Sequence, residues 1–216
     1  MHGTLALAIL AVGFAWPISA GAPQTSRPEP AGAIWPIDPA RSEARFTVTK
    51  LGYEDVTGVF RESEGEIRFD PARLESSSIR WRVRVASVLT DARNRDRALQ
   101  SKDYFDAGQH PYLSFVSRSV RAGQAGTIEV AGDITIRGVT RPLNISVRPG
   151  GTATEPTFET DFEVDRYDFG VVGGSMLGRL IGARVRVHLR VATGAATTPT
   201  TSPTIATISK TAEWRM

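Results

Sequence analysis

Few side chains in this sequence have the types and spacing that catalysis or metal binding requires. The chain has no cysteine, which excludes disulfides, thiolate nucleophiles and cysteine-bound metals. Its three histidines, His2, His110 and His188, lie far apart in the sequence. No Ser/His/Asp pattern and no phosphate-binding glycine loop accompanies them. We therefore expect no metal site, no cofactor and no enzymatic activity.

Carboxylates alternate with apolar residues instead of converging on one point. Asp161, Glu163 and Asp165 are separated by Phe162 and Val164, so in an extended strand all three carboxylates fall on one face. We interpret that face as solvated and its carboxylates as partners of neighbouring arginines. The 26 basic and 23 acidic residues leave a net charge of +3. That excess is too small to indicate nucleic-acid binding.

Three arginines are candidates for contact with the polar group of a ligand. Arg137, Arg141 and Arg166 could hold a phosphate or another polar head by charge-assisted hydrogen bonds. The alternative is that they form surface or structural salt bridges, and the sequence leaves both interpretations open.

Residues 78–87 predict the kind of element that must position such groups. Apolar residues alternate there with arginines, namely Ile79, Trp81, Val83 and Val85 with Arg80, Arg82 and Arg84. A strand sends successive side chains to opposite faces, so one face of this segment is apolar and the other is charged. A helix would spread the arginines around its circumference. The segment is therefore predicted to be one strand of an antiparallel sheet with a buried and a solvated face.

The same alternation recurs along the chain at short spacing. It appears in residues 44–51, 56–60, 65–69, 113–118, 128–136, 143–148, 158–165 and 184–191. Only residues 91–101 favour a helix, which is short. This pattern predicts an all-β fold, either a sandwich or a barrel. We favour a closed antiparallel up-and-down β-barrel of about eight strands, because closure leaves no unpaired edge. A barrel of this size is filled by side chains or holds one small ligand.

The apolar faces of these strands contain the candidate ligand-binding residues. They are Phe46, Val48, Phe60, Trp81, Val83, Val85, Phe115, Ile134, Ile136, Phe162, Phe169, Val185 and Val187. One interpretation is a packed core, and the other is a lumen that admits a hydrocarbon chain. The alternation alone does not decide between them.

A glycine-rich segment, 170–182, follows the strand at 158–165. It has five glycines and apolar side chains that include Met176 and Leu177. We expect either a mobile lid over the mouth of the barrel, with Met176 and Leu177 as further lining residues, or a simple glycine-rich connection.

The two ends of the chain differ in composition from the middle. Residues 1–20 contain an uncharged apolar run and a small-residue ending at Ala20, which predicts a signal peptide and export to the periplasm. The alternative is an uncleaved N-terminal anchor. Residues 21–33 read as a flexible lead-in and residues 34–192 as the barrel domain. Residues 193–216, rich in Thr, Ala and Pro, predict a disordered tail.

Several short motifs follow one another in order along 34–192. They are Ile37-Asp38-Pro39, Gly58-Val59-Phe60, Phe69-Asp70-Pro71, Asp103-Tyr104-Phe105-Asp106, the run from Gly132 to Pro142, and Arg166-Tyr167-Asp168-Phe169-Gly170. Together they resemble the YceI-like family of exported, lipocalin-like barrels that bind polyisoprenoid lipids. This chain has Arg41 and Lys50 where the family often has histidine, so any role of those histidines is absent or altered here.

The resemblance implies a function that the residues alone do not. It implies that the barrel binds, stores or carries a polyisoprenoid-type lipid, such as a polyprenyl chain or an isoprenoid quinone. The expected partners are this lipid and, transiently, a membrane surface; no nucleic acid is expected. A homodimer stays an open alternative to a monomer. Two other functions also stay open: an enzyme acting on a lipid in the same barrel, and a filled barrel that serves as a protein-interaction module.

Overall fold

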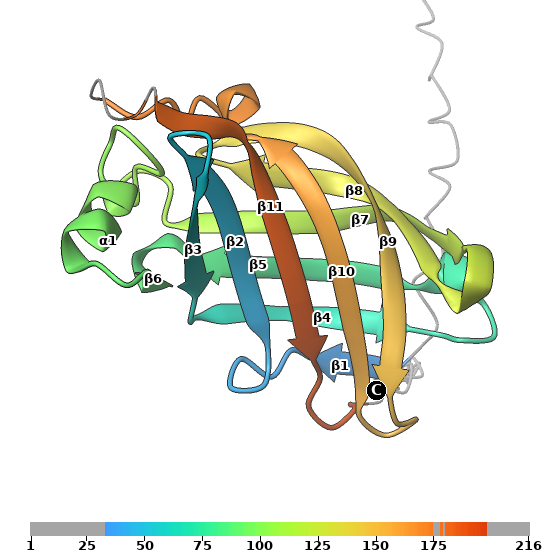
Figure 1. Cartoon of the computed structure of the whole chain (residues 1–216). Helices are drawn as coiled ribbons and strands as arrows, with labels where there is room; N and C mark the ends of the chain where they lie inside the picture. Colours follow the sequence, from blue (N-terminus) through green and yellow to red (C-terminus); the bar gives the residue numbers. More distant parts are fainter. Residues whose placement is uncertain (1–32, 175–177, 179, 198–216) are drawn as a thin grey trace, which may run out of the picture.

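The computed structural model describes residues 33–174, 178 and 180–197, which form an antiparallel β fold with one α-helix (Figure 1). The predicted all-β class and the short helix are confirmed. The predicted signal peptide lies outside the described residues, as do Met176, Leu177 and residues 198–216.

Eleven strands form one sheet with the order β1-β4-β5-β7-β8-β9-β10-β11-β2-β3-β6. The strands are β1 (Ala33–Pro36), β2 (Glu43–Lys50), β3 (Glu54–Phe60), β4 (Ser63–Phe69), β5 (Ser78–Arg84), β6 (Val88–Leu89), β7 (Tyr112–Ala122), β8 (Ile128–Ile136), β9 (Val139–Gly151), β10 (Pro156–Asp165) and β11 (Ile181–Ala192). The helix α1 spans Arg93–Gln100, and short 3₁₀ turns include η2 (Val85–Ser87) and η4 (Arg166–Phe169). In Figure 1 the sheet is strongly curled, so that β2, β11 and β10 cross in front of β4, β5, β7 and β8.

The number of strands exceeds the predicted eight or so because two long strands bend and β1 is added. β3 runs into β4 across residues 61–62, and β5 runs into β6 through η2. At these bends the Arg61 N–H donates to the Ser87 carbonyl (3.2 Å) and the Arg84 N–H donates to the Glu62 carbonyl (2.9 Å). The pairing of β3 with β6 therefore continues into the pairing of β4 with β5 around the corner.

Apolar and charged residues alternate along the strands, and their side chains lie on opposite faces of the sheet, as predicted. On β11, Val187 and Leu189 point inward while Arg186 and Arg190 are exposed. Acidic and basic residues pair across β10 and β11. Asp161 lies opposite His188 (2.7 Å) and Glu159 lies opposite Arg190 (3.9 Å), while Glu163 reaches Arg184 diagonally (3.7 Å). The outward carboxylates of β10 thus have the basic partners that the sequence predicts. Exposed pairs of this kind add little stability each, but they favour this register over its neighbours.

One end of the sheet is closed by β1, and we call it the sealed end. β1 pairs with β4, which places Trp35 opposite Ile67. The side chains beneath form the largest core cluster, with Trp35, Ile37, Ile67, Phe115, Val120, Ile128, Val130, Ile145, Val147 and Phe158 all buried. Residues beyond β11 also contribute, because Thr193 bridges to Ile37 and Thr197 bridges to Ile34. The predicted start of the disordered tail at residue 193 is therefore too early.

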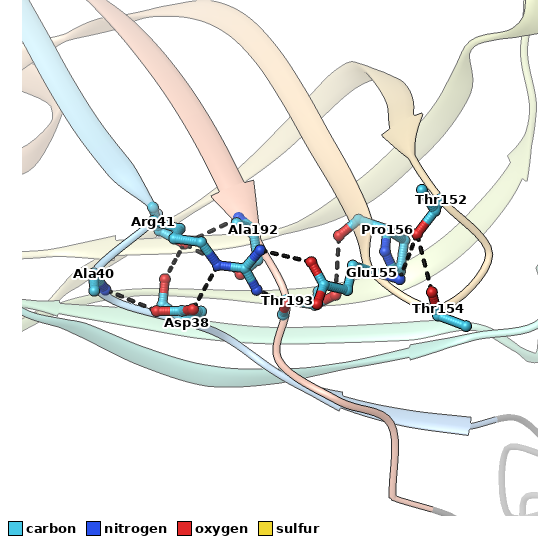
Figure 2. A network of polar contacts seen from close by, with 10 residues as sticks. Asp38, Ala40, Arg41, Thr152, Thr154, Glu155, Pro156, Ala192 and Thr193 are labelled. Atoms are coloured by element: carbon cyan, nitrogen blue, oxygen red, sulfur yellow. Dashed lines mark hydrogen bonds and ion pairs between the residues drawn. The ribbon is translucent and has the colours of Figure 1, made fainter.

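A polar network fastens the sealed end from outside (Figure 2). The Arg41 guanidinium contacts the Asp38 carboxylate at 2.7 Å and the Glu155 carboxylate at 2.8 Å, and it donates to the Thr193 carbonyl at 2.7 Å. The buried Thr193 hydroxyl donates in turn to the Pro156 carbonyl (2.9 Å). Arg41 therefore connects the β1–β2 turn, the β9–β10 turn and the end of β11. We call these contacts the Arg41 network.

The opposite end, which we call the mouth, is built from loops and α1. The segment before α1 is held by the buried Asp96 carboxylate, which accepts from the Thr90 N–H (2.7 Å) and hydroxyl (2.6 Å). The loop after α1 meets the segment that follows η4, where the Gly173 N–H donates to the Asp103 carbonyl (3.0 Å). The β2–β3 turn joins the same end through a hydrogen bond from the Leu51 N–H to the Leu180 carbonyl (2.8 Å).

Candidate functional site

An apolar cavity of about 260 Å³ lies inside the curled sheet. Its wall is contributed by α1 and by strands β2 to β5 and β7 to β11. Ligand pockets are typically concave, mostly apolar spaces of a few hundred cubic ångströms. The cavity is the best-formed candidate site in the part of the chain that the structure describes.

Most of the predicted lining residues do face this cavity. They are Phe46, Val48, Phe60, Trp81, Val83, Phe115, Ile134, Ile136, Phe162, Phe169, Val185 and Val187. Met176 and Leu177 lie outside the described residues. The prediction for Val85 is wrong. The strand ends at Arg84, and Val85 begins η2 with its N–H donating to the Pro111 carbonyl (2.9 Å), so the parity of the strand no longer applies.

Inward-facing side chains near the mouth are only half-buried, although they point away from solvent. Phe46, Val48, Phe162, Val185 and Val187 all have this intermediate burial and all line the cavity. In a close-packed core such side chains would have lost almost all of their exposed surface. Their remaining accessible surface faces the cavity, so this part of the interior is a lumen and not only a core.

Several lining residues were not among the predicted set. Leu99 comes from α1, and Tyr104 and Phe105 come from the loop that follows it. The Phe105 ring meets the Phe60 ring edge-on with centroids 5.9 Å apart. Leu99 lies four residues after Arg95 and therefore shares its helix face. Both residues line the cavity.

The polar groups in the wall are few and mostly satisfied by the protein. The buried Thr160 hydroxyl donates to the Ser146 carbonyl (2.9 Å). Lys50, Arg95 and Arg166 are the basic residues near the mouth that contribute to the wall, and none of the described lining residues is a carboxylate. Tyr104 contributes the one phenolic hydroxyl among the described lining residues. Such a wall suits an uncharged hydrocarbon body.

Arg166 lines the cavity but is not available to a ligand head group. Its guanidinium is buried and donates to the carbonyls of Val171 (2.6 Å), Val172 (3.0 Å), Gly178 (2.8 Å), Ile181 (2.9 Å) and Gly182 (2.9 Å). It also donates to the Tyr167 hydroxyl (2.7 Å). A guanidinium has five N–H donors, and all are occupied. The prediction of a head-group contact is wrong for Arg166, whose partners are backbone carbonyls.

The other two candidate arginines do not converge with Arg166 on the cavity. Arg137 lies in the β8–β9 turn and donates to the carbonyls of Gly170 and Lys102. Arg141 is exposed on β9, and neither Arg137 nor Arg141 lines the cavity. The three arginines therefore do not converge on the cavity, and the backbone contacts of Arg137 and Arg166 agree with the structural alternative. A head-group contact stays a prediction for Arg137 and Arg141.

Titratable groups with shifted pKa values lie on the outside of the sheet. The pKa of Asp161 is lowered by its hydrogen bonds from Arg148 (2.7 Å) and His188 (2.7 Å) on the solvated face of β9, β10 and β11. In the described part of the chain, no three His, Asp or Glu side chains gather as a metal site. Within the same residues, no helix is long and apolar enough to cross a bilayer.

Comparison with known families covers the region that contains the cavity. Residues 35–193 match the model of the YceI-like domain. A "UPF0312 protein" of Pseudomonas fluorescens is 38% identical over 136 residues, which are 58% of this chain and 69% of that protein. A "UPF0312 protein" of Shewanella denitrificans is 30% identical over 138 residues, 61% of this chain and 72% of that protein.

Solved structures share the fold. BcnA of Burkholderia cenocepacia superposes with a TM-score of 0.68 at 23% identity, covering 72% of this chain and 98% of BcnA. A domain of Saccharophagus degradans described as polyisoprenoid binding and implicated in plant cell wall breakdown superposes with a TM-score of 0.60 at 14% identity. That match covers 74% of this chain and 98% of the domain.

Proposed function

The chain belongs to the YceI-like family, and from that premise we propose that its cavity binds an isoprenoid-type lipid, a polyprenyl chain or an isoprenoid quinone. The observation that carries this proposal is the half-buried apolar wall formed by Phe46, Val48, Phe162, Val185 and Val187. The polyisoprenoid-binding description of the Saccharophagus neighbour supports the same ligand class.

The energetics of lipid binding favour a carrier or store, which releases its lipid again, over a protein that binds the lipid irreversibly. Burying hydrocarbon from water gains about 0.8 kcal/mol per methylene, so a chain of forty carbons would nominally gain roughly 30 kcal/mol, beyond the ceiling of about 18–21 kcal/mol for non-covalent binding. The relevant starting point is a membrane, however, and not water. Moving the lipid from one apolar medium to another changes its free energy little, so the protein exchanges lipid with a bilayer.

The pairing of the strands supports a closed barrel. If β3 with β4, and β5 with β6, each count as one bent strand, the pairings run β2, β3/β4, β5/β6, β7, β8, β9, β10, β11 and back to β2. We infer from this ring a barrel of eight strands whose mouth is the route for the lipid. The uncharged run within residues 1–20 further supports export to the periplasm.

We propose that the protein has no catalytic activity of its own. A catalytic role on a lipid would need a proton donor or acceptor inside the cavity. Among the described lining residues there is no carboxylate and no histidine, and the Tyr104 phenol and the Lys50 amine are the titratable groups besides the arginines. A filled barrel acting only as a protein-interaction module is opposed by the half-buried inward side chains at the mouth.

Mass spectrometry of lipid extracted from the purified full chain tests the proposal. We expect the wild-type chain and the Arg186→Trp variant to carry lipid and Val187→Trp to carry little, because Val187 lines the cavity and its neighbour Arg186 is exposed on the outer face. Equal lipid in the two variants would place the ligand elsewhere. If the delipidated wild-type chain takes up neither a polyprenyl lipid nor a quinone, the proposal is wrong.

A further inference from the structure

We propose that the rim of the mouth is a docking surface for a lipid bilayer, an inference that rests on the proposed function. Seven large hydrophobic residues are exposed in the part of the chain that the structure describes. Five of them lie on the segments that border the mouth: Leu51 (43% exposed), Tyr53 (80%), Tyr167 (47%), Val172 (50%) and Leu180 (42%). We call these five residues the mouth rim.

The mouth rim is one surface although its residues come from three segments. The Leu51 N–H donates to the Leu180 carbonyl (2.8 Å), which joins the β2–β3 turn to the segment before β11. The Arg166 guanidinium donates to the Val172 carbonyl (3.0 Å) and the Tyr167 hydroxyl (2.7 Å), and it lies 4.1 Å from the centre of the Tyr167 ring. In Figure 1 the β2–β3 turn, η4 and the start of β11 meet at the top of the view.

The mouth rim continues into the wall of the cavity. Val172 follows the lining residue Val171, and Leu180 precedes the lining residue Ile181. Apolar side chains thus run from the outer edge of the mouth to the interior without an intervening polar band on these two segments. A hydrocarbon chain that leaves a bilayer beneath this edge would meet the apolar side chains of Val172, Val171, Leu180 and Ile181 on its way into the cavity.

A bilayer fits this surface better than a protein partner does. The proposed ligand resides in a membrane. If it passed through water, every methylene would lose the favourable free energy that comes from being buried away from water. Charges beside the mouth rim are mixed, with the Lys50–Glu54 pair (3.1 Å), the exposed Lys102 and the exposed Asp103. Adhesion therefore has to come from the apolar and tyrosine side chains, and tyrosine suits the boundary between lipid and water.

The absence of cysteine from the chain makes a site-specific test direct. Tyr53→Cys in the mouth rim and Val116→Cys on the outer wall of β7 each create one attachment point for a polarity-sensitive fluorophore. Val116 is a matched control because it is also an exposed hydrophobic residue (47%), and it lies within β7 opposite Arg80 and not on one of the three segments of the mouth rim. Each labelled full chain is mixed with phosphatidylcholine and phosphatidylethanolamine vesicles, with and without a lipid that carries a nitroxide quencher on its acyl chain.

We expect the label at position 53 to gain intensity with vesicles and to be quenched by the nitroxide lipid, and the label at position 116 to show neither change. Because the two proteins share their N-terminal residues, any attachment through residues 1–20 affects both alike. A label at position 53 that stays in water, or equal quenching at the two positions, would overturn the docking surface.

A second variant tests the surface without a label. Replacing Tyr53, Val172 and Leu180 together by serine should weaken the vesicle-dependent transfer of a fluorescent prenyl lipid roughly tenfold, while Val116→Ser leaves it unchanged. Uptake of the same lipid from detergent reports on the cavity alone. Normal uptake from detergent with unimpaired transfer by the triple variant would reject the docking surface and retain the proposed function. No uptake by the wild-type chain would reject the proposed function itself.

Discussion

The sealed end and the mouth are made from the same strands, yet they differ in how closely their interiors are packed. At the sealed end, inward side chains such as Val120 and Val130 are buried in one large cluster. Near the mouth, inward side chains such as Phe46 and Val187 are half-buried and face the cavity. Alternation therefore decides which way a side chain points, and the distance to the opposite wall decides whether it becomes core or lining.

The two ends also use their arginines differently. At the sealed end Arg41 is partly exposed and connects two carboxylates and one carbonyl. At the mouth Arg166 is buried and its partners are five backbone carbonyls and one hydroxyl. The first arrangement is screened by solvent and contributes modestly. The second satisfies the backbone carbonyls of Val171, Val172, Gly178, Ile181 and Gly182.

The largest difference between the two ends should appear when one aromatic residue is truncated at each. Trp35→Ala removes a buried ring of the core cluster that does not line the cavity, and we expect a loss of about 3–5 kcal/mol in the free energy of unfolding. Phe46→Ala enlarges an existing cavity, so we expect a loss of roughly 1–2 kcal/mol. Urea denaturation of both variants measures the two values. Equal losses would mean that the mouth is packed as tightly as the sealed end.

Loss of the Arg166 guanidinium should come next in size. Arg166→Gln leaves buried carbonyls of the 171–182 segment without donors, and we expect a loss of about 2–4 kcal/mol in the free energy of unfolding. Arg148→Gln, which removes an exposed partner of Asp161, should leave the free energy of unfolding nearly unchanged, because solvent screens the pair. Hydrogen exchange should show faster exchange in 170–174 and 180–182 of Arg166→Gln, with the sealed end unchanged. Uniformly faster exchange along the whole chain would contradict a local role.

A glycine substitution at each end sharpens the comparison further. A Cβ at Gly132 would meet the Phe115 ring and the Val116 carbonyl oxygen, each at 2.5 Å, inside the packed cluster. A Cβ at Gly58 would meet the Phe46 ring, which borders the cavity. We expect Gly132→Ala to lose about 1–3 kcal/mol and Gly58→Ala less than about 1 kcal/mol, since the Phe46 ring has space to move. Gly58→Ala should also reduce lipid uptake, and a larger loss of stability than in Gly132→Ala would refute the comparison.

The smallest effect is a dependence on pH at the sealed end. The pKa of Asp38 lies below its ordinary value of 3.8 because the Arg41 side chain donates a hydrogen bond to it. The ionised Asp38 therefore stabilises the fold fully above pH 3.8, and this contribution is lost as the pH falls through the lower pKa of the folded state. Asp38→Asn should make the acid side of the stability profile shallower, as thermal unfolding between neutral and acid pH can measure. Parallel profiles for the two proteins would show that Asp38 contributes nothing there.

The sequence allowed the class of fold and the inward direction of most side chains to be predicted. Phe46, Trp81 and Val187 follow the period of a strand, so their placement required no knowledge of the partner strands. Val85 was misplaced because the strand ends one residue earlier. The bend is stabilised by hydrogen bonds to distant segments, which a local pattern does not reveal.

The arginines could not be assigned from the sequence for a related reason. The partners of Arg137 and Arg166 are backbone carbonyls, and every residue has a carbonyl, so composition gives no sign of which arginine they will engage. Arg41 differs because one of its partners, Asp38, lies only three residues away in the sequence. Its other partner, Glu155, is distant in the sequence. The pairing of β10 with β11 and of β11 with β2 brings Glu155 close to Arg41 in space.

The chain enters the described fold at Ala33 and leaves it at Thr197, and the bridge between Ile34 and Thr197 places these two points side by side at the sealed end. Anything fused to either of them, whether an affinity tag, a fluorescent reporter or a linker to a sensor chip, is attached on the side away from the cavity opening. An immobilised molecule would therefore keep its entrance accessible, which suits surface-based assays of lipid capture in either orientation of the fusion.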